Sequence, residues 1–175
     1  MKGRIELMMI LAVLLIFGAP GVRAQDSDDD EEGDQGAVVK ALPQAKISLG
    51  QALDACEREG KPISAKFEME DGKLQLSVYT MKGDKLSEVI VDHMSGKVSK
   101  AEPITGGEDL TSAKSQSEAM AKAKRPLRAA VDEALKANKG YRAVSVVPAL
   151  KEGHPMAELT LAKGEELKTV AEKLE

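Results

Sequence analysis

The chain has 175 residues, of which 25 are basic and 29 acidic, giving a formal net charge of −4 at pH 7. Nucleic acids and anionic lipids bind to basic surfaces, which this charge balance disfavours. The chain has no tryptophan, two tyrosines and two phenylalanines, so it also lacks rings on which single-stranded nucleic acid could stack. We therefore expect no nucleic-acid partner.

Residues 1–24 are predicted to be a secretory signal peptide. Two basic residues precede an apolar run over residues 7–17, and Val22 and Ala24 satisfy the small-x-small rule. Cleavage is therefore expected between Ala24 and Gln25, with an uncleaved N-terminal anchor as the alternative. The run is shorter than the roughly twenty residues that span a bilayer. We expect a secreted or periplasmic protein whose mature chain has no membrane span.

The mature chain would be more acidic than the whole sequence. The signal segment contains three bases and one acid, so its removal leaves a net charge of about −6. Cys56 is the only cysteine, which excludes an intramolecular disulfide. Stability must therefore come from an aliphatic core.

Seven of the nine residues from Asp26 to Asp34 are acidic. Such self-repelling runs are typical of disordered tails, which we predict over residues 25–36. Alternate aspartates in the run resemble a calcium-binding loop, but Glu31 stands where that loop requires glycine. Cation binding by the tail is kept as an alternative function.

Residues 47–60 are predicted to form a short amphipathic helix. Ser48 and Gln51 form a capping box, and Gly60 supplies the stop. The apolar face consists of Leu49, Ala52, Leu53 and Cys56. We interpret Cys56 as a small core residue rather than a reactive thiol.

Three strands are predicted after this helix, because apolar and polar residues alternate. They cover residues 62–70, 73–81 and 86–92, with Asp71-Gly72 and Gly83-Asp84 as hairpin turns between them. The turn "DHMSGK" then leads into a short last strand at Val98.

The second half begins with a predicted linker over residues 103–114, which contains a proline and a Gly-Gly pair. A helix is expected next, with Ser115 and Glu118 as a capping box, and Pro126 must either kink it or begin a second helix. The core face of this region is Leu127, Ala130, Val131 and Ala134. A hairpin around "KEGH" follows, and the last segment is expected to be a strand or a helix.

The two halves of the chain are similar to each other. A shift of 78 residues places the apolar face of the first helix on that of the second, and a shift of 81 places "KGDKLSEV" on "KGEELKTV". We therefore predict an α+β fold of two repeats, at residues 37–102 and 115–175. Each repeat is expected to be an α-helix packed on its own three- to four-stranded antiparallel sheet.

The segment 47–100 resembles the PepSY domain, through a helix opened by "ISLGQAL", three meandering strands and the end "VIVDHMSGKV". The family's turn positions are matched by Asp92, Gly96 and Val98, with His93 as an exposed turn residue between them. The second copy lacks this turn and is degenerate.

The resemblance implies a non-catalytic module. PepSY domains occur in the propeptides of secreted metallopeptidases and in exported bacterial proteins, where they are thought to bind and restrain peptidases. The expected partner is therefore a protein or an extended peptide, with a secreted peptidase as the first candidate. An envelope-associated binding protein without peptidase inhibition is the alternative, and oligomeric state is left open.

Neither a catalytic site, a cofactor site nor a metal site is predicted from the residues. His93 and His154 are the only histidines, and no His or Cys pair has the spacing of zinc ligands. The acidic residues Glu68, Glu70 and Glu88 fall at outward strand positions, where solvated charge is the usual explanation. Asp92 is expected to accept backbone N–H groups in its turn, and Gly96 to adopt a positive φ. Extended peptides are expected to pair with a free sheet edge.

Overall fold

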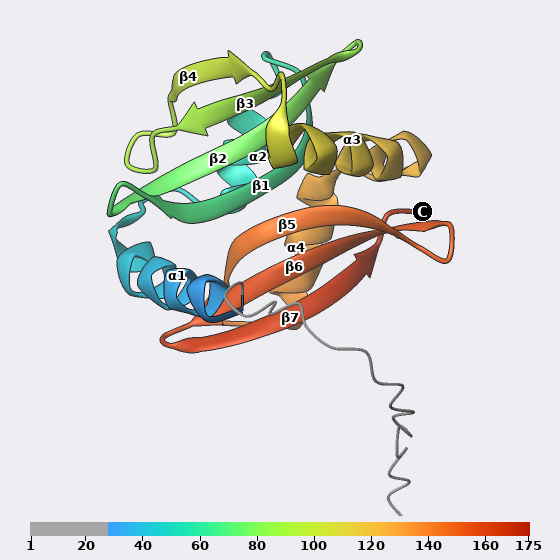
Figure 1. Ribbon diagram of the computed structural model, residues 1–175. Coiled ribbons are helices and arrows are strands. Elements are labelled where there is room, and N and C mark those ends of the chain that lie inside the picture. The colour runs from blue at the N-terminus through green and yellow to red at the C-terminus, as the bar shows by residue number, and fades with distance from the viewer. Residues whose placement is uncertain (1–27) are drawn as a thin grey trace, which may run out of the picture.

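In the computed structural model, which describes residues 28–175, seven strands form one antiparallel sheet in the order β4-β3-β2-β1-β5-β6-β7 (Figure 1). The strands are β1 Lys61–Glu70, β2 Lys73–Lys82, β3 Lys85–Val91, β4 Val98–Pro103, β5 Arg142–Lys151, β6 His154–Lys163 and β7 Glu166–Lys173. Strands that are consecutive within each half pair with each other, as the hairpin signals predicted. The two edges of the sheet are β4 and β7.

The predicted fold of two repeats, each with its own sheet, is wrong. A helix followed by antiparallel strands does occur in both halves, with four strands in the first and three in the second, but β1 pairs with β5 and so joins all seven strands in one sheet. The physical reason is that a three- or four-stranded meander leaves its first strand with an unpaired edge. β1 and β5 are the first strands of the two meanders, and their pairing covers part of the free edge of each.

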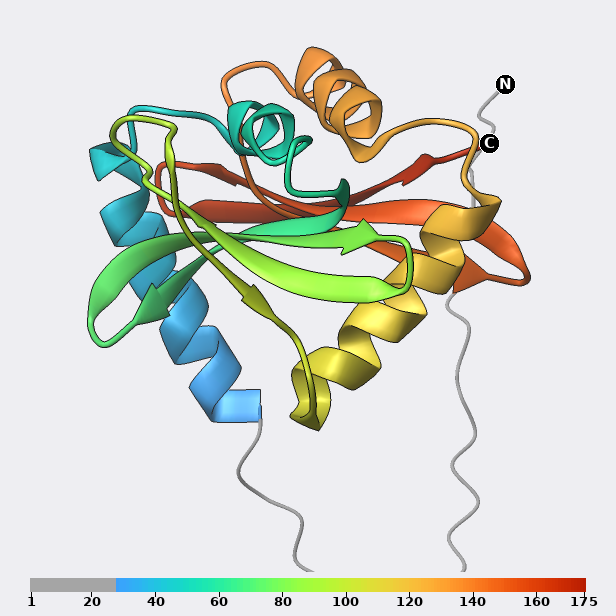
Figure 2. The same ribbon diagram turned by 90° about the horizontal axis from the view of Figure 1, so that it is seen from above.

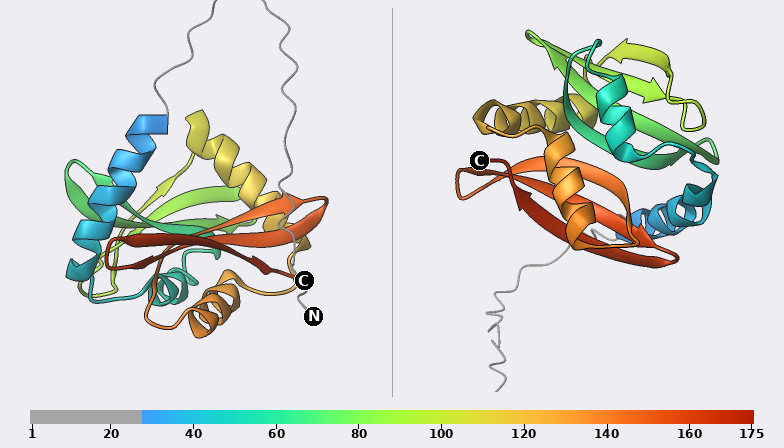
Figure 3. Two further views of the ribbon diagram at one scale, coloured as in Figure 1. Left: turned by 90° about the horizontal axis from the view of Figure 1, so that it is seen from below. Right: turned by 180° about the vertical axis from the view of Figure 1, so that it is seen from behind.

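Helices cover both faces of this sheet within the described residues. They are α1 Asp28–Ala41, the 3₁₀ helix η1 Leu42–Gln44, α2 Leu49–Ala55, α3 Gly107–Lys122 and α4 Leu127–Ala137. Figure 2 shows α2 and α4 on one face and α1 and α3 on the other, and Figure 3 shows the same three layers from below and behind. In this part of the chain no helix has the length and apolar character needed to cross a membrane.

The described residues include only part of the N-terminal segment for which predictions are made. The predicted signal peptide and its Ala24–Gln25 cleavage site lie outside the described residues. Residues 28–36, which were expected in a disordered tail, form the first turns of α1. The end of this helix is anchored because Val38 and Val39 are buried against the sheet, followed by Leu42 of η1.

The main core lies between the sheet and the helix pair α2 and α4. Ser48 and Gln51 form the predicted capping box at the start of α2, with Ser48 N donating to Gln51 Oε1 at 2.8 Å. The predicted apolar faces of both helices are buried, including Cys56, whose side chain is 0% exposed. Burial, helped by the charge of Glu59, raises the pKa of the Cys56 thiol to about 12.

Pro126 begins a second helix. It is the N-cap of α4, while α3 has ended at Lys122. The start of α3 differs from the prediction: this helix begins at Gly107, within the expected linker, so the expected capping box of Ser115 and Glu118 lies inside it. The last segment, for which strand and helix were both open, is strand β7.

The segments that lead into α2 and α4 are each hydrogen-bonded to a residue just after the end of a strand. The carbonyl of His93, just after β3, accepts hydrogen bonds from Lys46 N at 2.9 Å and Ile47 N at 3.2 Å. The carbonyl of Leu174, just after β7, accepts from Lys124 N at 2.7 Å and Arg125 N at 3.1 Å. These bonds fix where α2 and α4 lie on the sheet.

The junction between β1 and β5 is the shortest strand pairing in the described sheet. Only Ala65 with Val146 and Lys66 with Ser145 are paired, whereas β1 pairs with β2 along nearly its whole length. Both strands are irregular here, with register shifts at Pro62/Ser64 in β1 and at Ala143/Ser145 in β5. Bulges increase local twist and end pairing, so the two strands part on either side of the junction.

Candidate functional site

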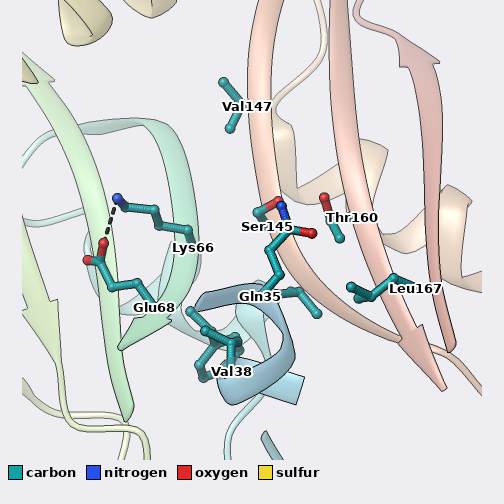
Figure 4. Close-up of a pocket in the computed structure, with 10 residues that line it drawn as sticks. Gln35, Val38, Lys66, Glu68, Ser145, Val147, Thr160 and Leu167 are labelled. Carbon is teal, nitrogen blue, oxygen red and sulfur yellow. Dashed lines mark ion pairs between the residues drawn. The ribbon is translucent and has the colours of Figure 1, made fainter. Parts of the chain in front are cut away.

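A cavity of about 400 Å³ lies beside α1, where β1 and β5 part (Figure 4). It is lined by Gln35, Val38, Lys66, Phe67, Glu68, Val144, Ser145, Val147, Thr160 and Leu167. A second cavity of about 220 Å³ lies beside α3 and shares Lys66 and Val147 with the first. We call the two together the central cleft. Its volume is in the range of ligand-binding pockets.

Strand periodicity explains why polar side chains line the central cleft. Alternate residues of a strand point to opposite faces, so Ser64, Lys66 and Glu68 of β1 share the face that carries α1 and α3. Ser145 is paired with Lys66 on one side and with Thr160 of β6 on the other, which extends this polar face across three strands.

Glu68 is the centre of a hydrogen-bonded group in the cleft. Its Oε2 lies 2.5 Å from Lys66 Nζ, and its Oε1 accepts hydrogen bonds from Ser77 and from Gln75, the latter over 3.4 Å. The side chain of Glu68 is only 17% exposed. The interpretation of Glu68 as a solvated surface charge is therefore wrong.

The α3 side of the cleft is held by two hydrogen bonds to the sheet. Tyr79 Oη donates to Asp109 Oδ1 at 2.7 Å, and Ser64 Oγ donates to Gln116 Oε1 at 2.7 Å. Burial and the hydrogen bond to Asp109 raise the pKa of Tyr79 above its ordinary range. Glu88 lies opposite Tyr79 on β3, and burial together with the charges of Glu68 and Asp109 raises its pKa.

Two hydroxyl groups of the cleft are available to a ligand. Ser145 and Thr160 are half-buried and line the larger cavity, and neither side chain hydrogen-bonds to another described residue. Figure 4 shows Ser145 on β5 and Thr160 on the neighbouring β6, across the gap from Lys66 and Glu68. The cleft thus combines the Lys66–Glu68 ion pair with hydroxyl groups that can donate or accept hydrogen bonds.

The predicted motif residues form a structural turn away from the central cleft. Asp92 Oδ1 accepts hydrogen bonds from Met94 N at 2.9 Å and Ser95 N at 2.7 Å, and Gly96 has φ +75°. These bonds and this φ are the ones expected of the turn. Val98 is exposed and begins β4, so none of the motif residues lines the cleft.

The two histidines lie in different parts of the fold, His93 in the turn after β3 and His154 at the start of β6. His154 has its Nδ1 2.7 Å from Glu175 Oε1 at the surface. The Nδ1 atom of His93 is buried without a hydrogen-bond partner among the described residues. In the described part of the chain no group of three His, Cys, Asp or Glu side chains has an arrangement that could hold a metal ion.

Comparison with known proteins gives no match to a family model, to a curated protein or to a solved structure. The resemblance to the PepSY domain therefore stays a prediction.

Sequence reasoning missed the central cleft, although one signal for it is visible. Ser64, Lys66 and Glu68 alternate with apolar residues, which indicates a polar strand face. A polar face is usually solvent-facing, and nothing in the strand itself shows that two helices will flank it. A second signal is the pair of small apolar residues Ala113 and Ala119 in α3, which need a surface to pack against.

Proposed function

We propose that this protein is a non-catalytic binding module whose central cleft receives a polypeptide segment of a partner protein. The observation that carries the proposal is the cleft itself, which opens across the middle of the sheet with two hydroxyls, Ser145 and Thr160, unpartnered within the described residues. Polar groups of this kind, set among apolar contacts from Val38 and Leu167, suit a peptide with both polar and apolar groups.

The ionisable groups of the cleft favour binding over catalysis. Glu68 is bonded to Lys66 and Ser77, and Asp109 accepts the hydroxyl of Tyr79. Groups bonded to each other in this way hold the walls of the cleft in place. A general base or nucleophile needs instead to face the reacting atom.

The partner class comes from the sequence. The PepSY resemblance and the predicted signal peptide both support an exported partner, and a secreted peptidase is the first candidate. A binding protein that restrains no peptidase would use the same cleft. The two versions differ only in what happens to the activity of the bound partner.

The test is capture of exported proteins by the immobilised protein, carried out in parallel with a blocked cleft. The Ser145→Trp variant places a large ring in the 400 Å³ cavity. The matched control is Ser115→Trp, at an exposed position of α3 that lines neither cavity. Thermal unfolding of both variants checks that they remain folded.

We expect proteins retained by the wild type and the control to be lost from Ser145→Trp. Peptidases among them are then assayed with the protein added at increasing concentration. Inhibition that Ser145→Trp relieves supports the peptidase version, whereas retention without inhibition supports the alternative. Equal retention by all three proteins would overturn the assignment of binding to the cleft.

A further inference from the structure

The β1 strand carries an unpaired edge inside the sheet. It pairs with β2 from Lys61 to Glu70, but with β5 only at Ala65 and Lys66. The backbone groups of residues on one strand point alternately to its two neighbours. Part of the N–H and C=O groups of residues 67–70 therefore face β5 without pairing with it.

Within the described residues, no backbone group outside the strands satisfies this edge. Residues 67–70 take no part in the backbone hydrogen bonds of turns, loops and helix ends there. Backbone polar groups away from water are nearly always hydrogen-bonded, and an exposed strand edge is a template for another strand. We call these residues of β1 the inner edge.

The larger cavity lies against the inner edge. Phe67 and Glu68 line it from β1, while Val144 and Ser145 line it from β5. The register shift between Ala143 and Ser145 occurs at this point and turns β5 away from β1. Space, unpaired backbone and unpartnered hydroxyls therefore occur at one place.

Building on the proposed function, we propose that the partner segment binds in the central cleft as an extended strand that hydrogen-bonds to the inner edge of β1. The ligand class is an unfolded peptide backbone rather than a folded surface. Its side chains on the cleft face would meet Ser145 and Thr160, which favours residues with hydroxyl or amide groups. Proline is excluded at each position whose N–H pairs with β1.

The outer edges of the sheet are less suited to this role. On β7, Glu166, Lys168 and Lys173 are exposed, and β4 is a short strand that ends in Pro103. Charged side chains, short length and proline are the features that protect natural sheet edges from added strands.

The probe is an eight-residue peptide of alternating threonine and valine with a C-terminal fluorescein, titrated against the full chain by fluorescence anisotropy. Two further peptides carry N-methyl groups on one or the other alternate set of backbone nitrogens. A peptide that pairs with β1 through one edge should lose at least tenfold in affinity from one methylated set and little from the other. Hydrogen exchange should slow at those amides of residues 67–70 that face β5, and change little at those that face β2.

The outcomes separate the two proposals. Slower exchange at β4 or β7 instead of residues 67–70 overturns the inner-edge assignment. Equal affinity of all three peptides overturns it as well, because recognition would then not use the peptide backbone. In both cases the proposed function stands if Ser145→Trp weakens binding and Ser115→Trp does not. Failure of the peptide to bind overturns strand addition, whereas equal capture of exported proteins by all three chains overturns the proposed function itself.

Discussion

Tyr79 on β2 donates a hydrogen bond to Asp109 in the first turn of α3, over 2.7 Å, although the two residues are thirty positions apart. Tyr79 is buried, with 7% of the residue exposed, so its hydroxyl has little access to water. This bond holds the start of α3 against the sheet. Both residues line the smaller cavity of the central cleft.

Replacing Tyr79 with Phe should lower the free energy of unfolding by about 1 kcal/mol, the usual net value of such a bond. Urea unfolding measures this loss, and hydrogen exchange should quicken in the first turn of α3. Tyr141→Phe is the control, because the Tyr141 hydroxyl bonds to the exposed Glu166 and its loss should matter less. Equal losses in both variants would contradict this role of Tyr79.

Stability should fall at alkaline pH. Burial raises the pKa of Tyr79 above its ordinary range and that of Cys56 to about 12. The folded protein therefore holds both protons more tightly than the unfolded chain, whose groups ionise near about pH 8.5 for Cys and about 10 for Tyr. The stabilisation is complete below these values and is lost as pH rises.

Urea midpoints measured from about pH 7 to about pH 11 should show this decline. The combined Cys56→Ala and Tyr79→Phe variant should show a shallower slope over the same range. A wild-type slope that the two substitutions leave unchanged would mean that other groups cause the alkaline loss.

Arg142 should be a strong contributor to stability. Its guanidinium donates to the carbonyl oxygens of Leu42 at 2.9 Å, Ala45 at 3.1 Å and Ile47 at 3.3 Å. We expect Arg142→Met to cost about 2 kcal/mol, since hydrogen bonds from charged groups are stronger than neutral ones. Exchange should also quicken over residues 42–47. Arg58→Met, at an exposed position, should change neither measurement.

The Asp92 turn should make stability sensitive to acid. Its carboxylate accepts the N–H groups of Ser95 and Met94, and these bonds lower the pKa of Asp92. A lowered pKa means that the stabilisation is present above the ordinary value of about 3.9 and is lost as pH falls. Asp92→Ala should therefore be less stable than wild type at neutral pH, with the gap closing in acid. Asp84→Ala, in the β2–β3 turn, should keep the wild-type acid profile.

Local elements could be predicted because their causes are local. The alternation of Ile63, Ala65 and Phe67 defines one face of β1, and Asp71-Gly72 marks its hairpin. Ser48 caps α2 through a residue three positions away. In these cases the interacting groups are neighbours in the sequence, so spacing alone carries the information.

The pairing of β1 with β5 could not be predicted in the same way. The alternation of apolar and polar residues shows that β1 and β5 are strands, but it does not indicate which strand will pair with either edge. The junction also involves only two residue pairs. The cleft depends on this junction and on the position of α3. That position is set by contacts such as Tyr79 with Asp109, which are remote in sequence.

The brevity of the β1–β5 junction also has a consequence for the order of folding. The hairpins of each half close loops of a few residues, whereas Ala65 and Val146 meet only after more than half of the described chain has been brought together. Closing so long a loop costs conformational entropy, and the stabilisation from only two residue pairs offsets little of this cost. We expect the strands of each half to assemble early and their union to limit the folding rate. The packing of α2 against α4 would then be formed in the transition state.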